Sequence, residues 1–218
     1  MTFHLKSLAA LALLAALALP AQAAIATITF DTLVTGQTSF GFDGDGDSID
    51  DVVFSTTDPT GFNTLGPGLA QLYISEPGLE GTTLLSADLR VSFLNGATGS
   101  VTFGFALSTS GAAPGTGASL ALYDSSDQLL GSASVLGALF SLPGGGTSTF
   151  VEGELSLAFA GTASYGLFDF TGAGDRYIID NFSGNFGSVI PEPGSALLLL
   201  LGVAALAWRL PARRRLLK

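Results

Sequence analysis

Apolar residues in the central part of the chain recur at every second position within short segments. Ala26–Phe30 alternates in this way, and Leu89, Val91 and Phe93 share one parity. The same spacing returns in two later stretches, at Val101, Phe103, Phe105 and Leu107 and at Val151, Leu155, Leu157 and Phe159. Successive side chains of a strand point to opposite faces of a sheet, so this period predicts half-buried β-strands. Residues 24–188 show no sustained helical period.

Turn residues separate the predicted strands. Ser110–Ser119 and Ser141–Ser148 are rich in glycine, with one proline each, and are predicted to be exposed loops. Asp175–Phe182 is predicted to be the closing strand. Short alternating strands with turns between them predict an all-β fold, an antiparallel β-sandwich.

The two ends of the chain differ from this pattern. Lys6 precedes the apolar stretch Leu8–Leu19, and Pro20 and the small-residue site Ala21–Ala23 follow it. This is the layout of a secretory signal peptide, with cleavage expected after Ala23.

The C-terminus combines a proline-rich hinge, an apolar run and a basic tail. The run Ser195–Trp208 is 14 residues long, or about 21 Å as a helix, against a hydrocarbon core of roughly 30 Å. It predicts a short hydrophobic helix that holds the protein at the membrane transiently; the alternative is a single-pass tail anchor. Basic residues stay on the cytoplasmic side, so the preceding domain is expected to face outward.

This C-terminal arrangement resembles the PEP-CTERM sorting signal of exported proteins in Gram-negative bacteria that make exopolysaccharide. The resemblance covers Val189–Lys218: the motif residues are Val189, Pro191, Glu192 and Pro193, and the membrane-stop arginines are Arg209, Arg213, Arg214 and Arg215. It implies recognition at the inner membrane by the transpeptidase-like protease exosortase and removal of the tail near the motif. The chain is thereby divided into a signal peptide (1–23), an exported domain (24–188) and a sorting signal (189–218), with the mature protein at the cell surface or in the extracellular matrix.

Removing both signals changes the charge of what remains. Residues 24–188 keep two basic residues, Arg90 and Arg176, against seventeen acids, a formal charge of −15. Nucleic acids and anionic membrane surfaces are bound by basic patches, so neither is an expected partner. Divalent cations are favoured instead.

Missing residue types narrow the chemistry. The single histidine is His4, there is no cysteine, and the single tryptophan is Trp208. The exported domain therefore lacks the side chains for a Ser-His-Asp triad, a cysteine nucleophile, a Schiff base or a histidine-rich zinc site. The prediction is a protein that is not an enzyme.

The densest polar cluster lies between Phe40–Phe42 and Val52–Phe54. Carboxylates at alternate positions of a glycine-containing loop can converge on one hard cation, with a backbone carbonyl completing the set. The candidate ligands are Asp43, Asp45, Asp47, the Ile49 carbonyl and Asp51. The spacing resembles the calcium loops of thrombospondin type 3 repeats and dockerins, although Ser48 and Phe54 replace the glycine and glutamate of an EF-hand. Calcium is thus the expected cofactor, and the alternative is a solvated acidic turn.

Two further acidic features lie in predicted strands. Glu152 and Glu154 share the parity opposite to the apolar residues around them and are predicted to lie on a charged solvent face. The Ile-Asp-Asn-Phe sequence ending at Phe182 resembles the final strand of exported β-sandwich modules, including jelly-roll carbohydrate-binding modules, and implies a jelly-roll-like fold. In such modules an aspartate here helps to hold a structural calcium, with Asp31 as the corresponding acid; the alternative pairs Asp180 with Arg176 or a backbone amide.

Three function classes follow. The leading hypothesis is a non-enzymatic protein of the cell envelope or exopolysaccharide matrix, delivered by exosortase. The alternative is a carbohydrate-binding surface module or adhesin that stacks sugars on Tyr73, Tyr123, Tyr165 or Tyr177. A glycosidase built on Glu152 and Glu154 is the third.

Overall fold

The computed structural model describes residues 25–66, 71–82, 89–108, 115–139, 149–172, 174 and 176–187. All of them belong to one unit, Ala23–Ser188. The predicted signal peptide and sorting signal lie outside the described residues, as does the predicted loop Ser141–Ser148. Within the described ranges, no helix combines the length and the apolar character that a membrane crossing requires.

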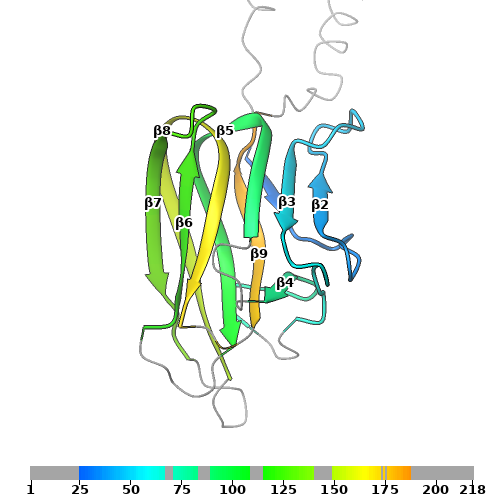
Figure 1. The fold of residues 1–218 in the computed structure, drawn as a ribbon, viewed down its shortest axis with the longest axis vertical. Coiled ribbons are helices and arrows are strands. Elements are labelled where there is room, and N and C mark those ends of the chain that lie inside the picture. Colours follow the sequence, from blue (N-terminus) through cyan, green and yellow to red (C-terminus); the bar gives the residue numbers. More distant parts are fainter. Residues whose placement is uncertain are drawn as a thin grey trace, which may run out of the picture. The chain divides into compact units, whose positions relative to one another are not determined.

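The described domain is built from antiparallel strands (Figure 1). They are β1 (Ala26–Ile28), β2 (Ser39–Phe42), β3 (Val52–Thr56), β4 (Leu79–Thr82), β5 (Leu89–Ser108), β6 (Gly117–Tyr123), β7 (Leu129–Leu136), β8 (Phe150–Thr171) and β9 (Arg176–Asn185). The main sheet order is β1-β9-β5-β8-β6-β7, with β3 joining β5, β2 joining β3 and β4 joining β9. The predicted all-β antiparallel architecture is confirmed.

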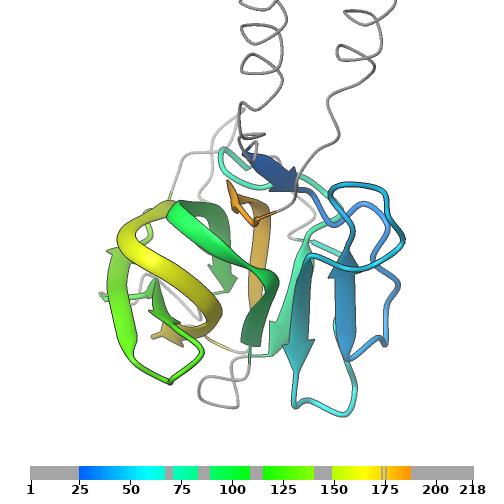
Figure 2. The same ribbon diagram turned by 90° about the horizontal axis from the view of Figure 1, so that it is seen from above.

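Two long strands, β5 and β8, take part in both layers of the domain. The first residues of β5 pair with β3, whereas its later residues pair with β9. Likewise, the first half of β8 pairs with the later residues of β5, and its second half pairs with the first residues of β5 on one side and with β6 on the other. The register of β5 shifts near Gly96 and Gly99, whose φ values are +79° and +80°. Such glycine bulges bend a strand, and Figure 2 shows β5 and β8 curving from one layer into the other.

The core lies on the inner side of this bent sheet. The residues that alternation assigned to the core of β5 and β8 are buried there, with Phe159 partly buried at its edge: Leu89, Val91, Phe93, Val101, Phe103, Phe105, Leu107, Val151, Leu155 and Leu157. Phe182 of β9 packs edge-on against Phe54 and stacks on Phe186. Large aromatic side chains bury the most apolar area per residue, so they carry much of the core stability.

One predicted loop is shorter than expected. Gly117–Ser119, assigned to the loop Ser110–Ser119, forms the start of β6. A Cβ on Gly117 would collide with the backbone oxygen of Val135 in β7. Glycine is required here because the two strands approach each other closely. The sequence alone suggests a turn at this position, since glycine is common in turns.

Candidate functional site

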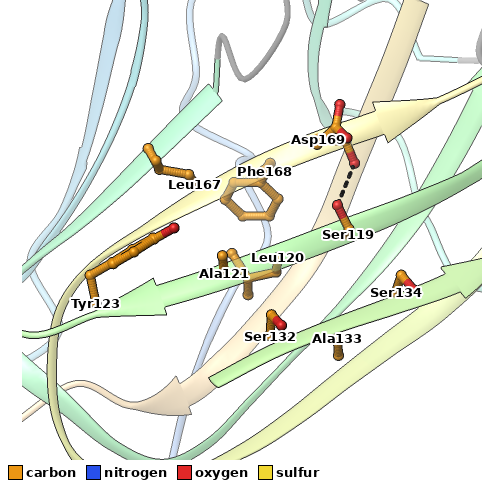
Figure 3. A pocket seen from close by; sticks show the side chains of 10 residues that line it. All are labelled: Ser119, Leu120, Ala121, Tyr123, Ser132, Ala133, Ser134, Leu167, Phe168 and Asp169. Carbon is orange, nitrogen blue, oxygen red and sulfur yellow. Dashed lines mark hydrogen bonds between the residues drawn. The ribbon is translucent and has the colours of Figure 1, made fainter. Parts of the chain in front are cut away.

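A depression of about 420 Å³ opens on the outer face of β6, β7 and the second half of β8 (Figure 3). We call it the Tyr123 trough. Its lining residues are Ser119, Leu120, Ala121, Tyr123, Ser132, Ala133, Ser134, Leu167, Phe168 and Asp169. Its volume falls within the range of small-ligand sites.

The trough follows from the pattern of β6. Ser119, Ala121 and Tyr123 occupy alternate positions and face away from the core, while Ala118, Leu120 and Leu122 are buried. Ala121 pairs with Leu167 on one side and Ser132 on the other. A methyl group between longer neighbours leaves a hollow, and the strand rise of about 3.3 Å per residue separates Ser119 from Tyr123 by roughly 13 Å.

A stacked aromatic wall closes one end of the trough. The Tyr123 and Tyr165 rings lie 5.0 Å apart and are tilted by only 13°. The guanidinium carbon of Arg90 lies 3.9 Å from the Tyr165 ring centroid. Because β8 lies between β5 and β6, Arg90 and Tyr123 contact Tyr165 from opposite sides. Tyr165 is therefore a support, and Tyr123 presents the ring that lines the trough.

The support is also fixed at its hydroxyl. Tyr165 donates a hydrogen bond to Asp127 Oδ1 over 2.9 Å. Partial burial, and then this carboxylate, raise the pKa of the Tyr165 hydroxyl. A ring held by a cation and a hydrogen bond loses little entropy when a ligand packs against its neighbour.

The other end of the trough is polar. Ser119 Oγ donates to the backbone oxygen of Asp169 over 3.4 Å, and Asp169 is exposed. Ser132 and Ser134 present hydroxyl groups from β7. A hydroxyl-bearing ligand would thus meet one aromatic wall, a carboxylate and several hydroxyls.

The opposite outer face, formed by β9, the second half of β5 and the first half of β8, is covered in part. Residues 71–77, which we call the covering segment, lie across it. The backbone amides of Leu72 and Tyr73 donate to Glu152 Oε2 over 2.8 and 3.3 Å. Ile74 packs with Ala106, Phe150 and Ile178 in a second, smaller cluster. A Cβ on Gly104 would collide with the backbone oxygen of Tyr73, so glycine is what lets the segment lie this close.

Glu152 corrects the prediction of a charged solvent face. It is only 3% exposed, while Glu154 two residues later is exposed. Parity placed both on the outer face of β8, but the covering segment buries the first and uses it as an amide acceptor. A carboxylate engaged in this way is not poised as an acid or base beside Glu154.

Asp180 pairs with backbone amides and not with Arg176. Its two oxygens accept the amides of Ser75 and Asn181, each at 2.7 Å, and it is 1% exposed. Burial, partly offset by these amides, raises its pKa from 3.8 to about 6, with a further contribution from Asp31. Arg176 instead pairs with Glu80 through Nε and Nη2.

The acidic loop joins β2 to β3, as predicted. Carboxylate oxygens of Asp43, Asp45 and Asp51 lie within 4.8 Å of one another. Asp47 is not in this group; its Oδ1 accepts a hydrogen bond from the backbone amide of Ile49, which is a different group from the Ile49 carbonyl predicted as a ligand. Backbone amides, Ser48 first, lower the pKa of Asp43, whereas desolvation and then neighbouring carboxylates raise that of Asp45. Three converging oxygens suit a hard cation.

The four tyrosines proposed as stacking surfaces have different environments. Tyr177 is 1% exposed and stacks on Phe170 at 4.2 Å, so that assignment is wrong. Tyr165 is enclosed by Arg90 and Tyr123. Tyr73 is 40% exposed on the covering segment, and Tyr123 lines the trough.

Sequence reasoning missed the polar half of the trough. No motif in the sequence marks its polar residues, which are Asp169, Ser119, Ser132 and Ser134. Parity within β6 could have placed Ser119 beside Tyr123 on one face. The neighbours from β7 and β8 depend on register, which a single sequence does not specify.

No protein-family model and no curated protein matches the chain. Among solved structures it is similar to the K2 cleaved adhesin domain of Lys-gingipain, with 16% identity, a TM-score of 0.41, and 75% of this chain and 98% of that one covered. It is also similar to a variant of a family 29 carbohydrate-binding module, with 12% identity, a TM-score of 0.37, and 77% of this chain and 95% of that one covered. A third similar structure is the CBM22-1 xylan-binding domain of Paenibacillus barcinonensis Xyn10C, with 12% identity, a TM-score of 0.36, and 78% of this chain and 99% of that one covered. All three scores are low, and function is set by a site rather than by a fold.

Proposed function

We propose that this chain is an exported, non-catalytic β-sandwich protein of jelly-roll type that binds carbohydrate at the cell surface or in the exopolysaccharide matrix. The observation that carries the proposal is the Tyr123 trough, an open hollow with one buttressed aromatic ring and a polar far end. The apolar face of a sugar ring packs on an aromatic side chain, while its hydroxyls need hydrogen-bonding partners. The trough therefore supports the carbohydrate-binding alternative better than a purely structural matrix protein.

Several features support a binding role without catalysis. The trough has one carboxylate, Asp169, whereas glycoside hydrolysis ordinarily uses two flanking the scissile bond. Glu152 is buried under the covering segment on the other layer. Residues 24–188 contain no histidine, cysteine or lysine to replace the missing partner.

Delivery to the surface belongs to the same proposal. Export by the N-terminal signal and sorting by exosortase at Pro191–Pro193 would bring the domain into contact with exopolysaccharide. Mass spectrometry of surface material should find a mature chain ending near Pro191–Gly194. Peptides from Arg213–Lys218 in the mature surface form would contradict the sorting step.

A structural calcium at the β2–β3 loop completes the proposal. Asp43, Asp45 and Asp51 would hold the ion and stiffen the hairpin. The loop is separate from the trough residues, so calcium would stabilise the fold without contacting the sugar.

Retention on extracted exopolysaccharide tests the binding function directly. The purified protein should be retained, and Tyr123→Ala should abolish most of the retention. Tyr73→Ala is the matched control, since it removes an exposed tyrosine from the covering segment. Equal retention of the wild type and Tyr123→Ala would overturn the assignment of the trough.

A further inference from the structure

We infer that the Tyr123 trough selects a cationic amino sugar, an oligosaccharide whose units carry protonated amino groups. The inference rests on the proposed carbohydrate-binding function and names its ligand class. It is carried by the Asp169 carboxylate at the polar end of the trough, together with the commitment of both arginines of the domain to other contacts.

Asp169 is suited to contact a ligand. It is exposed, and its pairing with Ser119 uses the backbone oxygen rather than the carboxylate. Within the described ranges no basic group forms an ion pair with it; the one ion pair found there joins Arg176 to Glu80. A protonated amine placed here would gain a charge-assisted hydrogen bond.

Among the described residues that line the trough, there is no basic side chain to meet an acidic sugar. Arg176 is paired with both oxygens of Glu80 on the β4–β9 side. Arg90 lies over the far side of Tyr165 and donates from Nε to Ser92. The aromatic end is acidic as well, because Asp124 and Asp127 lie in the turn that follows Tyr123. The electrostatic field at the trough therefore favours cations and disfavours anions.

The dimensions suggest how the ligand lies. Ser119, which pairs with Asp169, is roughly 13 Å along β6 from Tyr123. A single sugar ring on Tyr123 is too short to reach Asp169 as well. The ligand is thus an oligosaccharide with one ring against Tyr123 and an amino group of a later unit at Asp169.

Titration of three tetrasaccharides tests the inference on the purified protein. They are a glucosamine tetramer, its N-acetylated counterpart with the same backbone and no charge, and a galacturonic acid tetramer. At a pH where the amines are protonated, the glucosamine tetramer should bind about threefold to tenfold more tightly than the acetylated one, and the galacturonic acid tetramer most weakly. Added salt should reduce this preference.

Two variants assign the effect to residues. Asp169→Asn should remove most of the preference while leaving the affinity for the acetylated tetramer within about twofold. Glu154→Gln removes one exposed charge from the other layer and should leave the preference intact.

The outcomes separate the two proposals. Equal or weaker binding of the glucosamine tetramer than of the acetylated one, or a preference unaffected by Asp169→Asn, would overturn the ligand class and leave carbohydrate binding in place. So would retention on extracted exopolysaccharide without binding of the glucosamine tetramer. If the protein binds none of the three tetramers and does not bind the exopolysaccharide, the proposed function and this inference are both overturned.

Discussion

The two outer faces of the domain use the same strand geometry and end in opposite states. On β6, β7 and the second half of β8, outward side chains leave a hollow lined by Tyr123 and Asp169. On β9, the second half of β5 and the first half of β8, residues 71–77 cover the sheet and bury Glu152 and Asp180. The first face exposes its carboxylate, whereas the second uses two carboxylates to hold the covering segment and leaves a third, Glu154, exposed.

The comparison shows that an acidic side chain on an outer sheet position has no fixed role. Asp169 is exposed, and none of the described residues buries it. Glu152 and Asp180 accept backbone amides that would otherwise be buried without a partner, and these bonds offset part of the cost of their own burial. All three side chains are carboxylates, and the presence or absence of the covering segment decides whether each one is buried.

The largest expected effect is the pH dependence of the covered face. The pKa of Asp180 is 3.8 when unfolded and about 6 in the fold. The folded state therefore binds the proton more tightly, and the contribution of this group to the unfolding free energy falls as pH rises from about 4 to about 6. The difference is on the order of 3 kcal/mol.

Denaturant unfolding at pH 4 and pH 7 measures this effect. Asp180→Asn should remove this part of the pH dependence, whatever it does to absolute stability. Asp31→Asn should reduce the dependence slightly, since Asp31 is a minor cause of the raised pKa. An identical pH profile for wild type and Asp180→Asn would show that burial of this carboxylate has no energetic consequence.

Gly104→Ala should break the cover on one face only. The added Cβ collides with the Tyr73 backbone oxygen, so the covering segment must shift away from Glu152 and Asp180. We expect a loss of about 2 kcal/mol in unfolding free energy. In Gly131→Ala, on β7, the new Cβ would lie 3.4 Å from its nearest neighbour, the Cδ1 atom of Leu157, which is an ordinary contact. Equal melting temperatures for the two variants would contradict the close approach seen at Gly104.

Tyr123→Ala tests the open face, and it should affect glycan binding more than folding stability. Removing the ring should weaken glycan binding about tenfold, or about 1.4 kcal/mol, and lower the unfolding free energy by no more than about 1 kcal/mol through loss of the cross-strand stack on Tyr165. Calorimetric titration and a melting curve on the same sample give both numbers. A large loss of stability with unchanged binding would reverse the roles assigned to the two faces.

The smallest effect concerns the β2–β3 loop, which belongs to neither face. At a calcium concentration about tenfold above a dissociation constant on the order of 10⁻⁴–10⁻³ M, the ion should add roughly 1.4 kcal/mol at most. Melting in calcium should exceed melting in NaCl of matched ionic strength. Asp45→Asn should remove the difference, and Asp47→Asn should keep it, because Asp47 lies outside the converging group. An equal response to both salts would indicate a solvated acidic turn.

The sequence by itself determined the strands and the side of each strand that is buried. Leu89, Val91 and Phe93 are in the core because apolar alternation requires a buried face, and this is a local property of the chain. The hairpin around Asp43–Asp51 was predictable for the same reason, since turn residues lie between two alternating segments. Chain composition also narrowed the chemistry, because residues 24–188 lack histidine, cysteine and lysine.

Only the tertiary structure decided which outer positions are covered and which meet across strands. Glu152 and Glu154 have the same parity, but a segment about eighty residues earlier buries only the first. Tyr123, Leu167 and Ser132 come together through the register of three strands, and the loop backbone brings Asp43, Asp45 and Asp51 together without Asp47. Alternation fixes the face of a side chain, whereas its neighbours depend on contacts between distant segments that no local period encodes.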